Sequence, residues 1–130
     1  MSDMSEMRSS LGRARGLGSA KEGVGHWWAQ RVTAIALVPL SIWFVIAVIS
    51  LIGADYAVFQ AWIGTFGNAL LMILTALVLF YHAHLGMQVV IEDYVHGEAA
   101  RIATLLVVKF VLASLAASCV LAVVLVALRS

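Results

Sequence analysis

Three long apolar stretches constrain this chain more than any other feature. The first is Val32–Ile52, 21 residues without a charge; the second lies within the uncharged residues 57–91; the third runs over about residues 103–128 and carries one charge, Lys109. A helix rises about 1.5 Å per residue and the hydrocarbon core of a bilayer is about 30 Å thick, so each stretch can span it. The sequence therefore predicts an all-α membrane protein with three transmembrane helices, at about 32–52, 68–91 and 103–128.

The composition excludes several classes of protein. Hydrophobic residues make up 63% of the 130 residues and charged residues 12%, whereas a soluble domain usually carries about 25% charged residues. A soluble chain of this length could not bury so much apolar surface, which excludes a soluble enzyme. The net charge of +1 provides no basic face for nucleic acid. The single cysteine, Cys119, excludes an internal disulfide and a multi-cysteine metal site.

The regions that flank the spans predict the domain organisation. Residues 1–25 are polar, contain glycine and serine, and show no apolar periodicity. We expect a flexible N-terminal segment there, or one ordered only against a partner, followed by a three-helix membrane domain over 26–130. Residues Phe59–Phe66 are interpreted as an interfacial approach to the second span, and Pro39 predicts a kink inside the first.

The orientation follows from the basic residues near the ends of the spans. Before the first span stand Arg8, Arg13, Arg15, Lys21 and Arg31. The loop after that span has only Asp55, whereas Arg101 and Lys109 flank the start of the third span. The N-terminus and the second loop are therefore predicted to be cytoplasmic. Asp3 and Glu6 argue against a mitochondrial transit peptide, so a bacterial inner membrane is favoured over the mitochondrial one.

Ionisable side chains are rare inside membrane spans and usually functional. Here they gather late in the second span and at its exit: His82, His84, Glu92, Asp93 and Tyr94. If Asp93 marks the membrane surface, His82, eleven residues earlier, lies about 16 Å deeper and close to the bilayer midplane. Eleven residues turn a helix about 20° beyond three full turns, so both side chains share one face.

His82 has two interpretations from the residues alone. It can supply one axial ligand to a b-type haem, whose second histidine must then come from another polypeptide; Gly86, one turn on, leaves room for such a flat ligand. Alternatively, it can hold helices together by a hydrogen bond. His84 faces away from His82, so the two cannot bind one metal. The remaining histidines, His26 and His96, are expected near the membrane surface.

A second polar cluster stands at the start of the first span, and it consists of His26, Trp27, Trp28 and Arg31. The tryptophans are typical of an aromatic belt at the membrane interface. Arg31 can hold haem propionates or an anionic intermediate, or it can bind a lipid phosphate. Asp93 and Tyr94 can likewise form an ordinary interfacial pair.

The second span carries a histidine, a glycine four residues on, and an Asp-Tyr pair eleven residues on: His82, Gly86, Asp93 and Tyr94. Together with the run Arg31-Val32-Thr33-Ala34, this pattern resembles the small hydrophobic membrane anchor of succinate dehydrogenase (respiratory complex II). The resemblance covers about residues 24–128. It implies a helical bundle with a second three-span anchor, and the two anchors together hold a flavoprotein and an iron–sulfur protein on the membrane.

The resemblance also implies roles for single residues. Succinate is oxidised in the flavoprotein, so no succinate site is expected in this chain, and electrons pass through iron–sulfur clusters to ubiquinone. His82 is similar to the haem b ligand of the small anchor, the other ligand coming from the second anchor. Tyr94 is similar to a tyrosine that donates a hydrogen bond to a quinone carbonyl, and Asp93 to its neighbour. Arg31 is similar to an arginine near the propionates and the quinone, and His26 to a nearby histidine. A quinol:fumarate reductase anchor and a structural membrane protein without cofactor remain the alternatives.

Overall fold

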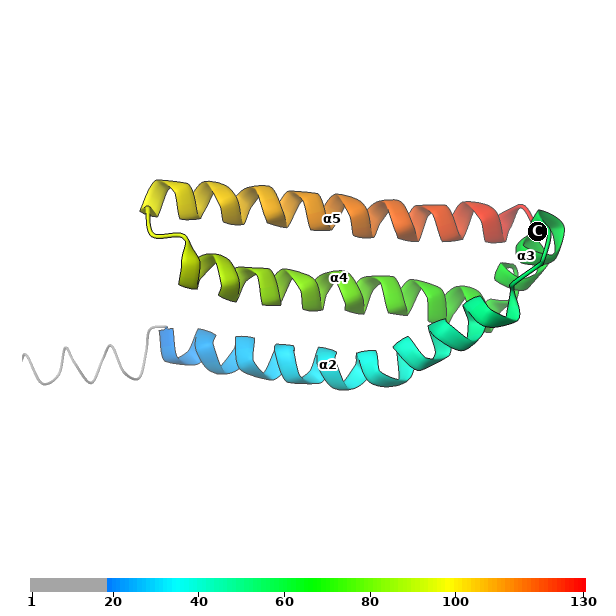
Figure 1. The fold of residues 1–130 in the computed structure, drawn as a ribbon, viewed down its shortest axis with the longest axis horizontal. Coiled ribbons are helices and arrows are strands. Elements are labelled where there is room, and N and C mark those ends of the chain that lie inside the picture. The colour runs from blue at the N-terminus through cyan, green and yellow to red at the C-terminus, as the bar shows by residue number, and fades with distance from the viewer. Residues whose placement is uncertain (1–18) are drawn as a thin grey trace, which may run out of the picture.

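A computed structural model describes residues 19–130, and this part of the chain forms four helices. They are α2 (Ser19–Ser50), α3 (Tyr56–Ile63), α4 (Phe66–Tyr94) and α5 (Glu98–Leu128). The three long helices run antiparallel in one layer, with α4 in the middle, packed against both α2 and α5 (Figure 1). The starts of α2 and α5 and the end of α4 therefore lie at one end of the molecule, with α3 and the C-terminus at the other.

The three long helices are apolar and long enough to cross a membrane, over Gly23–Ser50, Phe66–Tyr94 and Glu98–Leu128. The predicted spans at 68–91 and 103–128 lie wholly inside α4 and α5. The first long helix, α2, ends at Ser50, two residues before the predicted end of the first span. The all-α membrane protein with three membrane-spanning helices is thus confirmed.

The start of α2 differs from the prediction. We expected residues 19–25 to be flexible, but the helix begins at Ser19. Ala20, Lys21 and Glu22 are good helix formers, and extending an existing helix requires no new nucleus. A helix that leaves the membrane also needs no apolar periodicity, which is why the pattern did not indicate it. The rest of the segment expected to be flexible, residues 1–18, lies outside the described residues.

Pro39 lies inside α2, and the second half of this helix bends toward α3 (Figure 1). Proline has no backbone N–H and its ring presses on the carbonyl of the residue four positions earlier, so it bends a helix. The bend matches the kink predicted at Pro39. The bend is followed by a tight connection to α3, in which Gly53 takes a positive φ of 82°. At the start of α3 the Asp55 side chain accepts a hydrogen bond of 2.9 Å from the N–H of Val58.

Very few of the described residues are buried within the chain itself. The buried apolar residues are Ala47, Ile63, Leu85 and Ile91, and α5 contains none. Large apolar side chains are instead open, among them Phe66 at 81% and Leu128 at 78% exposure. An apolar surface of this extent is stable only against lipid or other apolar helices. The described chain therefore needs lipid or other apolar helices around it.

Candidate functional site

His82 projects from α4 toward α2 and meets Thr33 there. The Nδ1 atom of His82 lies 2.8 Å from the Thr33 hydroxyl oxygen. The same hydroxyl donates to the backbone carbonyl of Ala29, at 2.7 Å, within its own helix. Thr33 is 8% exposed and is the one buried polar residue among the described side chains. His82 is therefore tied to the neighbouring helix through a single, shielded hydroxyl.

A cavity of about 510 Å³ opens between α2 and α4, toward the end of the molecule that holds Tyr94. It is lined by Gly23, His26, Trp27, Gln30, Arg31, Gly86 and Val89. Gly86 and Val89 follow His82 at intervals of four and three residues, so they continue its face of α4. The predicted common face of α4 thus meets the polar cluster of α2, and it does so around an open space.

Two buried polar atoms of α2 have no hydrogen-bond partner among the described residues. They are Nε2 of His26 and Oε1 of Gln30, and both residues line the cavity. Buried polar atoms almost always have partners, so theirs must come from outside this part of the chain. Nε2 of His82 is not among these buried atoms, and the described hydrogen bond of this ring uses Nδ1. The second ring nitrogen thus has no hydrogen-bond partner among the described residues and is not fully enclosed by them.

Gly86 leaves space beside this histidine. A Cβ atom added there would meet only Nε2 of Gln30, at 3.9 Å, which is ordinary contact. Glycine inside a helix costs about 1 kcal/mol relative to alanine. No neighbouring atom of the described chain requires a glycine at this position. The space above Gly86 therefore suits a group supplied from elsewhere.

Arg31 lies at the cavity with its guanidinium 5.3 Å from the centre of the Trp27 ring. Trp27 in turn meets Trp28 edge-to-face, with ring centres 5.0 Å apart, and both tryptophans are about half exposed. A cation over an aromatic face is held in place without losing its charge. Arg31 is thus positioned to meet an anionic group at the mouth of the cavity.

The structure does not bring all the predicted site residues together. Asp93 and Tyr94 stand exposed at the end of α4, Tyr94 at 76%, and neither lines the cavity. Both lie at the same end of the molecule as the start of α2 (Figure 1). A binding site that includes them must take its other walls from outside the described chain.

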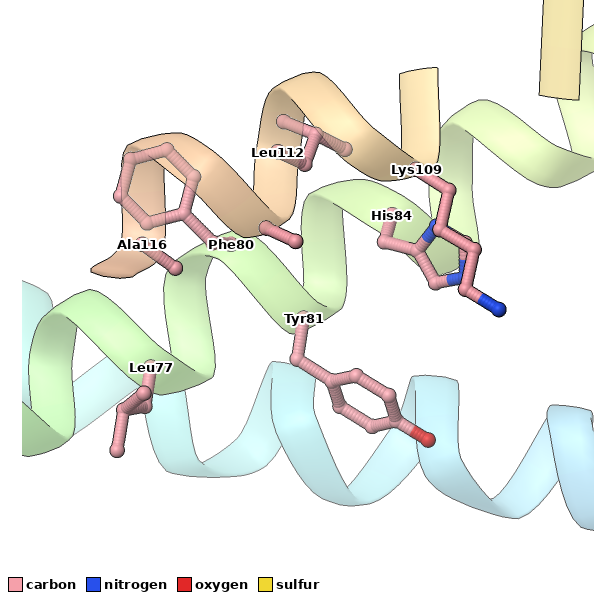
Figure 2. A pocket seen from close by; sticks show the side chains of 8 residues that line it. Leu77, Phe80, Tyr81, His84, Lys109, Leu112 and Ala116 are labelled. Atoms are coloured by element: carbon pink, nitrogen blue, oxygen red, sulfur yellow. The ribbon is translucent and has the colours of Figure 1, made fainter. Parts of the chain in front are cut away.

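His84 lies on the other side of α4 from His82, as the helical phase predicted. It faces α5 and lines a separate cavity of about 460 Å³ with Tyr81 and Lys109 (Figure 2). Among the residues that the structure describes, no three histidine, cysteine, aspartate or glutamate side chains converge on one point. Of the two histidines of α4, His82 therefore faces α2 and His84 faces α5.

Two residues of the site were not singled out as candidates from the sequence. Thr33 and Gln30 belong to the run at the start of the first span, but neither was given a role of its own. His26, Gln30 and Thr33 follow one another at intervals of four and three residues, so they form one stripe of a helix. A polar stripe that enters an apolar span was the signal that could have identified them.

Comparison with known proteins gives a consistent result. Residues 5–127 match the family model described as the succinate dehydrogenase/fumarate reductase transmembrane subunit. A succinate dehydrogenase hydrophobic membrane anchor subunit of Paracoccus denitrificans is 37% identical over 81% of this chain and 81% of its own length. The corresponding subunit of Rickettsia bellii is 35% identical over 80% of this chain and 83% of its own length. A succinate dehydrogenase membrane anchor subunit of Reclinomonas americana is 36% identical over 70% and 78%.

Proposed function

Because the chain belongs to the family of succinate dehydrogenase membrane anchor subunits, we propose that it anchors a succinate:ubiquinone oxidoreductase in the bacterial inner membrane. In this proposal it supplies one axial ligand to haem b and part of the ubiquinone site. The observation that carries the proposal is that Nε2 of His82 has no hydrogen-bond partner among the described residues, while Gly86, one turn along α4, lines a cavity with two unpartnered polar atoms. The N-terminus and the loop after α4 are cytoplasmic in this arrangement.

The residues present fit a haem at the α2–α4 face. Nε2 of His82 would bind the iron, the space above Gly86 would receive the edge of the macrocycle, and Arg31 with His26 would hold a propionate. Bound haem b accepts and releases single electrons. In this proposal the other histidine ligand would come from the second anchor.

We propose that ubiquinone is reduced at the end of α4. Reduction to the quinol takes two electrons, delivered by the iron–sulfur protein, and two protons. The hydroxyl of Tyr94 donates a hydrogen bond to a quinone carbonyl, and the carboxylate of Asp93 passes protons from the aqueous side. Support comes from the exposure of both side chains at a helix end, open to walls contributed by other subunits.

The partners follow from the uncovered surfaces. An apolar cavity of about 500 Å³ lies over α4 between α2 and α5, and α5 buries no residue within the described chain. Helices of a second three-span anchor would cover this surface, with lipid around them. The iron–sulfur protein would meet the end that holds Tyr94 and carry the flavoprotein, where succinate is oxidised.

One observation favours a second candidate, a structural membrane protein without cofactor. The hydrogen bond between His82 and Thr33 already joins α4 to α2, as a purely structural histidine would. The unpartnered atoms of His26 and Gln30 argue for a bound group instead. An anchor of a quinol:fumarate reductase shares the same geometry and differs in the direction of electron flow.

Capture of the assembly through this chain tests the proposal. A tag on the C-terminus lies at the end of the molecule remote from Tyr94 (Figure 1). After mild detergent extraction we expect a flavoprotein, an iron–sulfur protein and a second three-span anchor, with about one b-type haem per copy of this chain. Recovery of the intact chain with none of these proteins would contradict the proposal.

Replacing Gly86 by leucine fills the proposed haem space. The first atom of the new side chain makes only ordinary contact with Gln30, so the backbone of α4 has room for a side chain here. We expect haem content to fall roughly tenfold, in the range seen when groups next to a metal ligand are changed. The matched control is Gly67→Leu in the same helix, where nothing lies within 4 Å. Equal haem content in both variants would exclude this space as the haem site.

Replacing Arg31 by leucine removes the proposed propionate partner. A hydrogen bond to a charged group contributes about 1.5–3 kcal/mol, so haem should dissociate from the captured complex roughly ten- to a hundredfold more readily. Arg129→Leu, at the end of α5, is the control for lost charge. Haem retention by Arg31→Leu equal to that of the control would assign Arg31 to lipid phosphate instead.

A further inference from the structure

We propose that Thr33 is a positioning residue that holds His82 as the tautomer protonated on Nδ1, so that the lone pair of Nε2 faces the bound haem. This inference rests on the proposed function, since it concerns the same histidine. It goes beyond that function by naming the group that selects which ring nitrogen is free.

The assignment follows from counting protons among three atoms. The Thr33 hydroxyl oxygen lies 2.7 Å from the carbonyl oxygen of Ala29 and 2.8 Å from Nδ1 of His82. The hydroxyl has one proton, and a carbonyl oxygen can only accept. If the proton pointed to Nδ1, two oxygen acceptors would face one another at 2.7 Å with no proton between them. These atoms are satisfied when the hydroxyl donates to the carbonyls of its own helix, mainly that of Ala29 and more weakly that of Gln30 at 3.1 Å, and Nδ1–H donates to the hydroxyl.

The burial of Thr33 favours this arrangement of the two protons. Thr33 is 8% exposed, so solvent water has little access to replace a lost partner, and a buried polar atom without a partner is destabilising. A threonine hydroxyl in a helix commonly donates to the carbonyl four residues earlier, which is the bond to Ala29. The backbone of α2 thus orients the hydroxyl, and the hydroxyl orients the imidazole of α4.

The hydrogen bond at Nδ1 would affect the haem iron through the imidazole ring of His82. A ligating histidine whose other nitrogen donates a hydrogen bond is fixed in rotation and is a stronger base. A stronger donor stabilises the oxidised iron, so it lowers the haem midpoint potential. Without the Thr33 hydroxyl we expect a higher potential and a ring that is less narrowly oriented.

The test compares Thr33→Val, which keeps the shape and lacks the hydroxyl, with Thr33→Ser, which keeps the hydroxyl. In the captured complex, Thr33→Val should raise the haem midpoint potential, broaden the low-temperature EPR signal of the oxidised haem and weaken haem retention roughly tenfold. Thr33→Ser should resemble the parent protein in all three. Thr33→Ala replaces the valine variant if that one fails to assemble, and it should shift the potential in the same direction.

The possible results separate this inference from the function on which it rests. One result would overturn the role of Thr33 and leave His82 as the ligand. In it, Thr33→Val and Thr33→Ala both keep the haem potential and EPR signal of the parent protein, while His82→Leu loses the haem. Full haem content in His82→Leu would overturn the ligand itself. A change in Thr33→Ser equal to that in Thr33→Val would assign the effect to packing and also overturn the inference.

Discussion

Replacing His82 by leucine is expected to reduce the b-type haem of the captured complex at least tenfold. The leucine fills a similar volume but cannot bind iron, and one of two axial ligands is lost. The measurement is the dithionite-reduced minus oxidised absorbance spectrum, scaled to the amount of flavin. Electron transfer from succinate to a soluble dye should persist, because in the proposed function it depends on the flavoprotein and not on this histidine.

The matched control for this variant is His84→Leu. His84 is two residues away on the same helix, but it faces α5 and lines the cavity shared with Lys109 (Figure 2). Its replacement is expected to leave the haem spectrum unchanged. An unaltered spectrum in His82→Leu would exclude His82 as the ligand and would favour the interpretation in which it only joins α2 to α4.

Replacing Tyr94 by phenylalanine is expected to slow the reduction of ubiquinone by succinate roughly a hundredfold or more. Phenylalanine keeps the ring and removes the one donor that the proposal assigns to the quinone carbonyl; loss of a donor that stabilises a developing negative charge typically costs about 10²–10³ in rate. Because Tyr94 is 76% exposed in the described chain, the change should not affect the packing of the three helices. The measurement is the initial rate with ubiquinone beside the rate with a soluble dye.

The control for Tyr94→Phe is Tyr81→Phe, which removes a hydroxyl from the same helix within the cavity that contains His84. Only the Tyr94 variant should lose quinone reduction, and both should retain dye reduction. If Tyr94→Phe lowered both rates equally, the hydroxyl would be needed for assembly of the complex and not for the quinone.

The spans and the face of His82 could be predicted because each depends on one helix. Apolar length determines whether a helix can cross the bilayer, and helical phase separates His82 from His84 whatever packs around them. The start of α2 was missed because the residues before Gly25 leave the apolar region, where helix propensity gives the weaker signal.

The contacts of the site depend on more than one helix, so the sequence indicated them less completely. Thr33 meets His82 only because α2 and α4 run side by side in one register. The cavity that joins Gln30 to Gly86 has the same origin. In the proposed function the surroundings of Asp93 and Tyr94 include other subunits, because both side chains are exposed in the described chain.

The most direct test of the account is the succinate:ubiquinone reductase activity of the complex captured through this chain. We predict activity that a quinone-site inhibitor abolishes, while succinate still reduces a soluble dye. Intact chain that is recovered without such activity, together with proteins that are neither a flavoprotein nor an iron–sulfur protein, would contradict it.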